Sequence, residues 1–90
     1  METTSTATLL LTVRYFAAAR AAAGVETESM RVTAGTTVAS LVDDLSARSP
    51  ELARVLQRCS FLCDGFAVRD EGLNLLDGQI LDVLPPFAGG

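Results

Sequence analysis

The residues with the clearest chemical potential are two glycines at the end of the sequence. They close a six-residue segment, Pro85, Pro86, Phe87, Ala88, Gly89 and Gly90. Glycine has no side chain and permits many backbone conformations, so we expect residues 85–90 to form a thin, flexible tail that can enter a narrow channel. Its reactive group would be the α-carboxylate of Gly90. The alternative is a glycine-rich terminus that is merely frayed.

The sequence lacks the side chains that would normally do chemistry beside such a carboxylate. It contains no His, and all seven basic residues are Arg. Without His it lacks the usual general base near neutral pH. Without Lys it lacks a side-chain amine that could attack an activated carboxyl group, although a genome rich in GC codons is an alternative reason for this composition. We therefore expect any reaction at Gly90 to depend on partner enzymes.

The composition indicates one small globular domain. The chain has 90 residues, of which 49% are hydrophobic and 20% charged, with a net charge of −4. The negative charge disfavours nucleic acid as a partner and suits a basic surface on another protein. Neither a signal peptide nor an apolar run long enough to span a membrane is evident, so we expect a cytoplasmic protein with no membrane partner.

The two cysteines, Cys59 and Cys63, do not form a metal motif. Their spacing lacks the further Cys or His ligands that a zinc or iron–sulfur site needs, which also excludes a ferredoxin-type carrier. We expect reduced thiols in a cytosolic protein, with Cys63 as a small core residue. A role as a sulfur relay is the alternative.

The elements that would position the tail follow from the hydrophobic pattern. Alternation from residue 8 to 16 predicts a strand, and Val25–Val32 and Ile80–Leu84 predict two more. Residues 17–23 form an Ala-rich helix ended by Gly24, and spacing of i, i+3, i+4 predicts the main helix from Val38 to near Ser49. Further signals are a short helix from Pro50, a strand at 60–63 and a return arm at 66–68 after the Asp64-Gly65 turn.

This order of elements predicts an α+β fold, in which one main helix packs across one face of a mixed sheet. By fold analogy it fits a ubiquitin-like β-grasp, with the first and last strands parallel and side by side. We expect a disordered extension at residues 1–7, the domain at 8–84 and the tail at 85–90. Proline cannot donate to a sheet ladder, so Pro85 and Pro86 would end the last strand and direct the tail outward.

Four stretches resemble the small, sulfur-carrying subunit of molybdopterin synthase, a ubiquitin-like sulfur carrier. They are residues 11–16 with Ala17 and Arg20, residues 35–42, residues 76–78 and residues 84–90. The Gly-Gly end is shared by ubiquitin-like carriers, whereas the apolar-Pro-Pro-x-x-Gly-Gly pattern is similar to the molybdopterin branch. Cys63 and Gln79 depart from the family pattern and affect local turns.

The resemblance implies a reaction sequence at Gly90. A ubiquitin-activating-like adenylyltransferase would convert the carboxylate to an acyl-AMP, and sulfur would replace AMP to leave a thiocarboxylate. The large catalytic subunit would bind the tail and transfer the sulfur to a cyclic pyranopterin monophosphate, in a heterotetramer with two carriers. No cofactor would be bound permanently, and the chain alone would catalyse nothing.

Docking needs a surface beside the tail. Phe16 and Leu84 end neighbouring strands on the face shared with Arg14 and Asp82, so we expect them to anchor the partner interface, with Phe66 as a third candidate. The alternative is that Phe16 or Leu84 packs under a helix. Arg20 could pair with an acidic residue of the activating enzyme.

Two other functions stay open from the sequence. One is sulfur carriage in another pathway, such as thiamine, cysteine or tRNA thiolation, against which the Pro85-Pro86 pattern argues. The other is a β-grasp interaction domain without chemistry, in which the Gly-Gly end is incidental.

Overall fold

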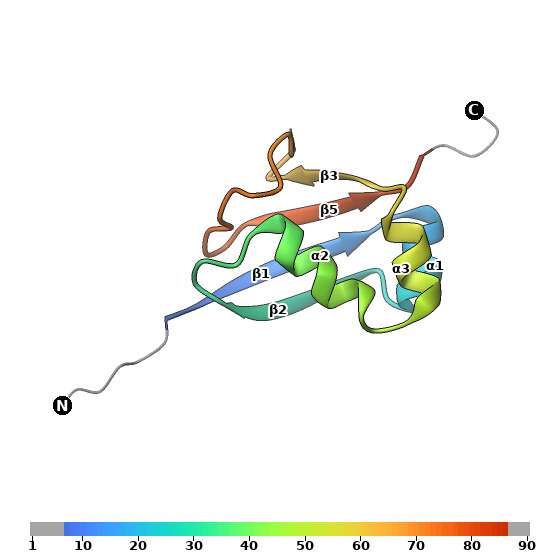
Figure 1. Ribbon diagram of the computed structural model, residues 1–90, viewed down its shortest axis with the longest axis horizontal. Coiled ribbons are helices and arrows are strands. Elements are labelled where there is room, and N and C mark those ends of the chain that lie inside the picture. The colour runs from blue at the N-terminus through green and yellow to red at the C-terminus, as the bar shows by residue number, and fades with distance from the viewer. Residues whose placement is uncertain (1–6, 87–90) are drawn as a thin grey trace.

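The structure, a computed structural model that describes residues 7–86, is a five-stranded mixed sheet with three helices (Figure 1). The sheet order is β2-β1-β5-β3-β4; β1 and β5 are parallel, and the other pairs are antiparallel. The elements are β1 (Thr8–Tyr15), α1 (Ala17–Ala23), β2 (Thr27–Thr33), α2 (Val38–Ser46), α3 (Pro50–Leu56), β3 (Ser60–Cys63), β4 (Phe66–Ala67) and β5 (Ile80–Leu84). This is the predicted α+β arrangement, with the first and last strands adjacent and parallel.

The helices pack over one face and one end of the sheet. In Figure 1, α2 crosses in front of the sheet, and α3 lies beside α1 at the end where the C-terminal segment leaves. The main helix was predicted to end near Ser49, but it ends at Ser46. Ser49 instead caps α3, because its side chain accepts a hydrogen bond from the backbone N–H of Leu52 at 3.0 Å. The second strand likewise begins at Thr27, two residues later than predicted.

Short-range signals in the sequence account for the ends of the helices. Thr37 and Ser40 form a capping box at the start of α2, which satisfies backbone N–H groups that have no partner in the helix. Gly24 ends α1 with a left-handed φ of 82°, which costs glycine little.

The core lies between the sheet and α2 and α3. Alternate residues of β1 face inward, so Leu11, Val13 and Tyr15 are each at most 1% exposed. The other buried apolar residues are Ala19, Val38, Leu41, Leu45, Leu52, Leu56, Phe61, Leu75, Leu81 and Val83. Each fully buried leucine or valine contributes about 1.5–3 kcal/mol relative to an exposed one, so this cluster holds the sheet to its helices.

Two aspartates fix the start of β5, the strand that leads to the tail. The Asp64 carboxylate accepts from the backbone N–H of Ile80 at 2.9 Å, and the Asp77 carboxylate accepts from that of Leu10 at 2.7 Å. Asp64 and Gly65 form a two-residue turn with φ of 50° and 86°, which aspartate and glycine tolerate. Among the described helices, none is long and apolar enough to cross a membrane.

Candidate functional site

The parallel strands β1 and β5 end together at one edge of the sheet. The backbone N–H of Phe16 donates to the carbonyl of Val83 at 3.2 Å, which ties the residue after β1 to the end of β5. Pro85 and Pro86 follow β5 directly and are the described part of the predicted tail. Phe87, Ala88, Gly89 and Gly90 lie outside the described residues. The chain therefore leaves the domain beside Phe16.

An ion pair between an exposed arginine and a buried aspartate occupies the middle of the sheet face opposite α2, which we call the outer face. Arg14 donates from Nε to Asp82 Oδ1 at 2.6 Å and from Nη2 to Oδ2 at 2.9 Å. Asp82 is only 6% exposed, and its hydrogen bond and charge raise the pKa of Arg14 above its usual value. Arg14 Cζ also lies 5.8 Å from the ring centroid of Phe16, within cation–π range. Arg14 thus links the strand carrying Asp82 to the aromatic ring beside the tail.

Phe16 and Leu84 lie at the tail end of this outer face. Phe16 is 40% exposed and Leu84 is half-buried, and neither belongs to the buried core cluster. The structure therefore brings together the two residues expected to anchor a partner. Their role in binding stays a prediction.

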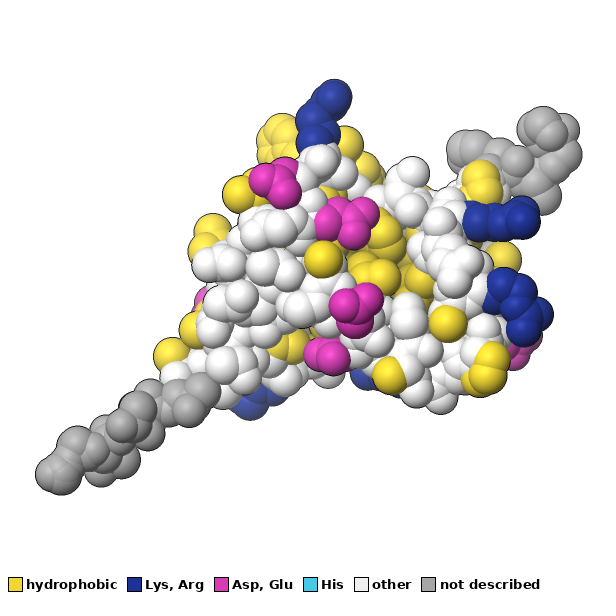
Figure 2. All heavy atoms as spheres, viewed as in Figure 1, with side chains coloured by type: hydrophobic (Ala, Val, Ile, Leu, Met, Phe, Trp, Pro, Cys, Tyr) yellow, Lys and Arg dark blue, Asp and Glu magenta, His cyan; other side chains and the backbone are white. Residues whose placement is uncertain are grey.

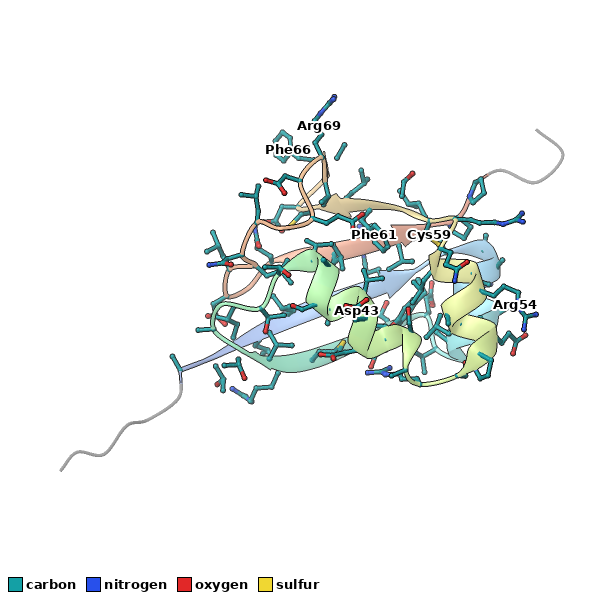
Figure 3. The ribbon with its side chains drawn as sticks, in the orientation of Figure 1. Asp43, Arg54, Cys59, Phe61, Phe66 and Arg69 are labelled. Atoms are coloured by element: carbon teal, nitrogen blue, oxygen red, sulfur yellow. The ribbon has the colours of Figure 1, made fainter. Side chains whose placement is uncertain are left out.

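Phe66 and Arg20 lie elsewhere. Phe66 is 78% exposed. It pairs with Cys63, and Cys63 in turn pairs with Leu81, which faces inward. Because paired residues point to the same face of a sheet, Phe66 points to the side of α2 rather than to the outer face. Figure 3 shows its ring projecting from the far end of the sheet beside Arg69. Arg20 lies on α1 and forms a 3.8 Å, largely exposed ion pair with Glu26.

Leu62 is an outer-face residue that the sequence reasoning missed. It is half-buried and pairs directly with Asp82 in the ladder between β3 and β5. Its neighbours Phe61 and Cys63 both face inward, and this alternation is the signal that predicts the opposite direction for Leu62. With Phe16 and Leu84 it gives the outer face an apolar rim around the Arg14–Asp82 pair.

Comparison with known proteins assigns the chain to a family. A model of the ThiS family matches residues 13–90. The chain belongs to the ThiS family. It is 32% identical over 79 residues to the molybdopterin synthase sulfur carrier subunit of Chlamydomonas reinhardtii, covering 87% of this chain and 95% of that protein.

Solved structures agree with the assignment to the ThiS family. The solution structure of the HVO 2177 protein of Haloferax volcanii is 29% identical, with a TM-score of 0.84 over 100% of this chain and 94% of the other. SAMP1 of the same organism, a small archaeal modifier protein, is 27% identical, with a TM-score of 0.77 over 90% of this chain and 99% of the other. The predicted β-grasp fold and resemblance to sulfur carriers are thereby confirmed.

The cysteines of this ThiS-family chain lie in surroundings that disfavour the thiolate form. Both are half-buried free thiols, and burial raises the pKa of each, with the charge of Asp64 contributing for Cys63. Cys59 Sγ also donates to the carbonyl of Val55 at 3.3 Å. Because the thiolate is the reactive form, these surroundings suit structural thiols. Within residues 7–86, no three His, Cys, Asp or Glu side chains are grouped so as to hold a metal ion.

Proposed function

We propose that this ThiS-family chain is the sulfur carrier subunit of a molybdopterin synthase and that Gly90 carries the sulfur. The observation that carries the proposal is the 32% identity to a curated sulfur carrier subunit across 95% of that protein, in a chain that has Gly89-Gly90 after its last strand. The protein acts in the cytoplasm and holds no permanent cofactor.

The proposed chemistry first activates the Gly90 carboxylate and then replaces one of its oxygens with sulfur. The Gly90 carboxylate attacks the α-phosphorus of ATP and releases pyrophosphate, giving an acyl-AMP. A sulfur nucleophile then bonds to the carbonyl carbon as AMP leaves, giving a thiocarboxylate that donates its sulfur to a cyclic pyranopterin monophosphate. A free carboxylate has only oxide as a leaving group, and adenylation supplies a better one. Positioning and proton transfer belong to the partner enzymes, which fits a chain without His.

Two protein partners follow from this chemistry. One is a ubiquitin-activating-like adenylyltransferase, and the other is the large catalytic subunit, in a heterotetramer with two carriers. Phe16 and Leu84 on the outer face contact the partner while residues 85–90 enter its active site. Their exposure at the base of the tail supports this, since apolar side chains beside a functional segment mark interfaces.

Intact-mass measurement tests the proposal. The chain is co-expressed with its adenylyltransferase and a sulfur donor, and we expect it to gain the mass of one oxygen-to-sulfur exchange on Gly90. A variant lacking Gly90, or one with a residue added after it, should fold normally and gain nothing. Conversion of the truncated chain would exclude Gly90 as the residue that carries the sulfur. An unchanged wild-type mass, under conditions that convert a known carrier, would refute the proposed function.

Protein modification is a second candidate, favoured by the likeness to SAMP1, a small archaeal modifier protein. Here an amine on another protein displaces AMP from Gly90 and forms an amide. A tagged chain would then appear in cells as covalent adducts that resist thiol reagents and disappear when Gly90 is deleted. Sulfur carriage in thiamine, cysteine or tRNA thiolation would instead show as complexes with other receiving enzymes. A binding module without chemistry would keep its partner after loss of residues 85–90.

A further inference from the structure

A second surface borders the base of the tail, around the sheet edge from Phe16. It is a hollow of about 290 Å³ between α1, α3 and the segment after β5, and we call it the basic hollow. It is lined by Ala18, Arg54, Val55, Arg58, Pro85 and Pro86. Its floor is thus apolar, and among the described residues that line it the only charged groups are two guanidinium groups.

These two arginines have no acidic partner among residues 7–86 that would compete with an outside anion. Among residues 7–86 the ion pairs involve Arg14, Arg20 and Arg48, and none involves Arg54 or Arg58. Both side chains are exposed, and Figure 3 shows Arg54 projecting from α3. Figure 2 shows dark blue side chains gathered beside the C-terminal segment, whereas most magenta ones lie toward the middle of the molecule. Basic side chains are thus concentrated beside the C-terminal segment in a chain whose net charge is −4.

We propose that the basic hollow docks an acidic segment of the large subunit, with an apolar side chain of that segment against Val55 and Pro86. This inference rests on the proposed function. The apolar floor favours a protein segment over a small inorganic anion, because an anion alone would leave the floor unfilled. Pro86 is itself part of the lining, so a subunit that takes up the tail lies within reach of the hollow.

The experiment measures the affinity of the full chain for the purified large subunit by calorimetry. The double variant Arg54→Glu/Arg58→Glu reverses the charge of the basic hollow. The control variant Arg31→Glu/Arg69→Glu makes the same charge change at exposed positions on β2 and after β4. In about 0.1 M salt we expect the first to raise Kd at least tenfold and the control less than about threefold. In about 1 M salt the difference in Kd between the two double variants should become smaller, because the screening length falls from about 10 Å to about 3 Å.

A second variant tests the floor without changing charge. Ala18 is exposed, so Ala18→Trp should fold and fill the hollow, raising Kd at both salt concentrations. Equal binding by wild type, Ala18→Trp and the double glutamate variant would overturn this inference while leaving sulfur transfer at Gly90 intact. The inference would also be overturned if the substitutions weakened binding only to the adenylyltransferase. It would likewise be overturned if deleting residues 87–90 of the free chain shifted the NMR signals of Ala18 and Arg54, because the tail itself would then occupy the hollow. A wild-type chain that never binds the large subunit would refute the proposed function as well.

Discussion

The hydroxyl of Tyr15 offers a sharp test of how the end of β1 is held. Tyr15 is 1% exposed, and its hydroxyl donates to Glu28 Oε2 at 2.6 Å. Arg48 donates from Nη1 to the same oxygen at 2.8 Å, so one carboxylate joins β1 to the turn between α2 and α3. Tyr15→Phe removes the hydroxyl and keeps the buried ring.

The expected cost follows from the kind of bond removed. A hydrogen bond to a charged group contributes about 1.5–3 kcal/mol. Phenylalanine leaves no unsatisfied donor, and Glu28 keeps Arg48, so we expect a loss near the lower end, about 1.5–2 kcal/mol. In a domain of this size each kcal/mol lowers Tm by about 4–8 °C, which predicts a fall of roughly 6–16 °C.

The pH dependence adds a signature that packing alone would not give. Burial, then the hydrogen bond to Glu28, raises the pKa of Tyr15 above its ordinary value of 10, so this contribution to stability is complete below pH 10 and declines above it. Burial acts to raise the pKa of Glu28, but hydrogen bonds from Arg48 and Tyr15 outweigh it and lower that pKa below 4.5. Ionised Glu28 therefore stabilises the fold above about pH 4.5, and this stability is lost as the pH falls further.

Urea unfolding followed by far-UV circular dichroism measures the effect. Tyrosine fluorescence is unsuitable, because Tyr15 is the only tyrosine and the variant lacks it. The stability difference between wild type and Tyr15→Phe should be largest between pH 5 and pH 10 and shrink on both sides. Glu28→Gln and the double variant complete a mutant cycle that isolates the pair. A difference below about 0.5 kcal/mol at pH 7, or one that is flat with pH, would refute the reasoning.

Three further changes test the core, the backbone and the outer face. Leu41→Ala should cost about 2–5 kcal/mol in urea unfolding because Leu41 is fully buried; a loss below about 1 kcal/mol would contradict the core assignment. Ala17 has a φ of 52°, so Ala17→Gly should stabilise by up to about 1 kcal/mol, and a clear loss would show that no strain is relieved. Phe16 exposes 40% of its surface, about 80 Å², so Phe16→Ala should weaken binding to the large subunit about 30-fold. Leu76 lies at the opposite end of the sheet, so an equal effect of Leu76→Ala would argue against a local interface.

The sequence predicted the elements whose signals are local. The alternation that predicts a strand at residues 8–16 also places Leu11, Val13 and Tyr15 on one face, which is the buried face of β1, because strand periodicity depends only on neighbouring residues. The Gly24 stop and the short helix from Pro50 were likewise predicted, since capping and helix-start signals act within a few residues.

Features that depend on strand register or helix packing were less accessible. Asp82 was expected on the polar face, but its burial under Arg14 arises only because strands 68 residues apart in sequence become neighbours. The direction of Phe66 depends on the two-residue turn that places it opposite Cys63. The basic hollow requires α1, α3 and Pro86 to converge, which no periodicity encodes.

The tail leaves the domain between two surfaces of different chemistry. On the outer face, Phe16 and Leu84 offer apolar area, whose contribution to binding changes little with salt. In the basic hollow, Arg54 and Arg58 offer positive charge, whose contribution is screened by salt. A partner that takes up the residues after Pro86 therefore has two separable sources of affinity. Because salt acts strongly on only one of them, a receiving enzyme that uses both should show binding that weakens with salt to a finite limit, and loss of Phe16 should lower that limit.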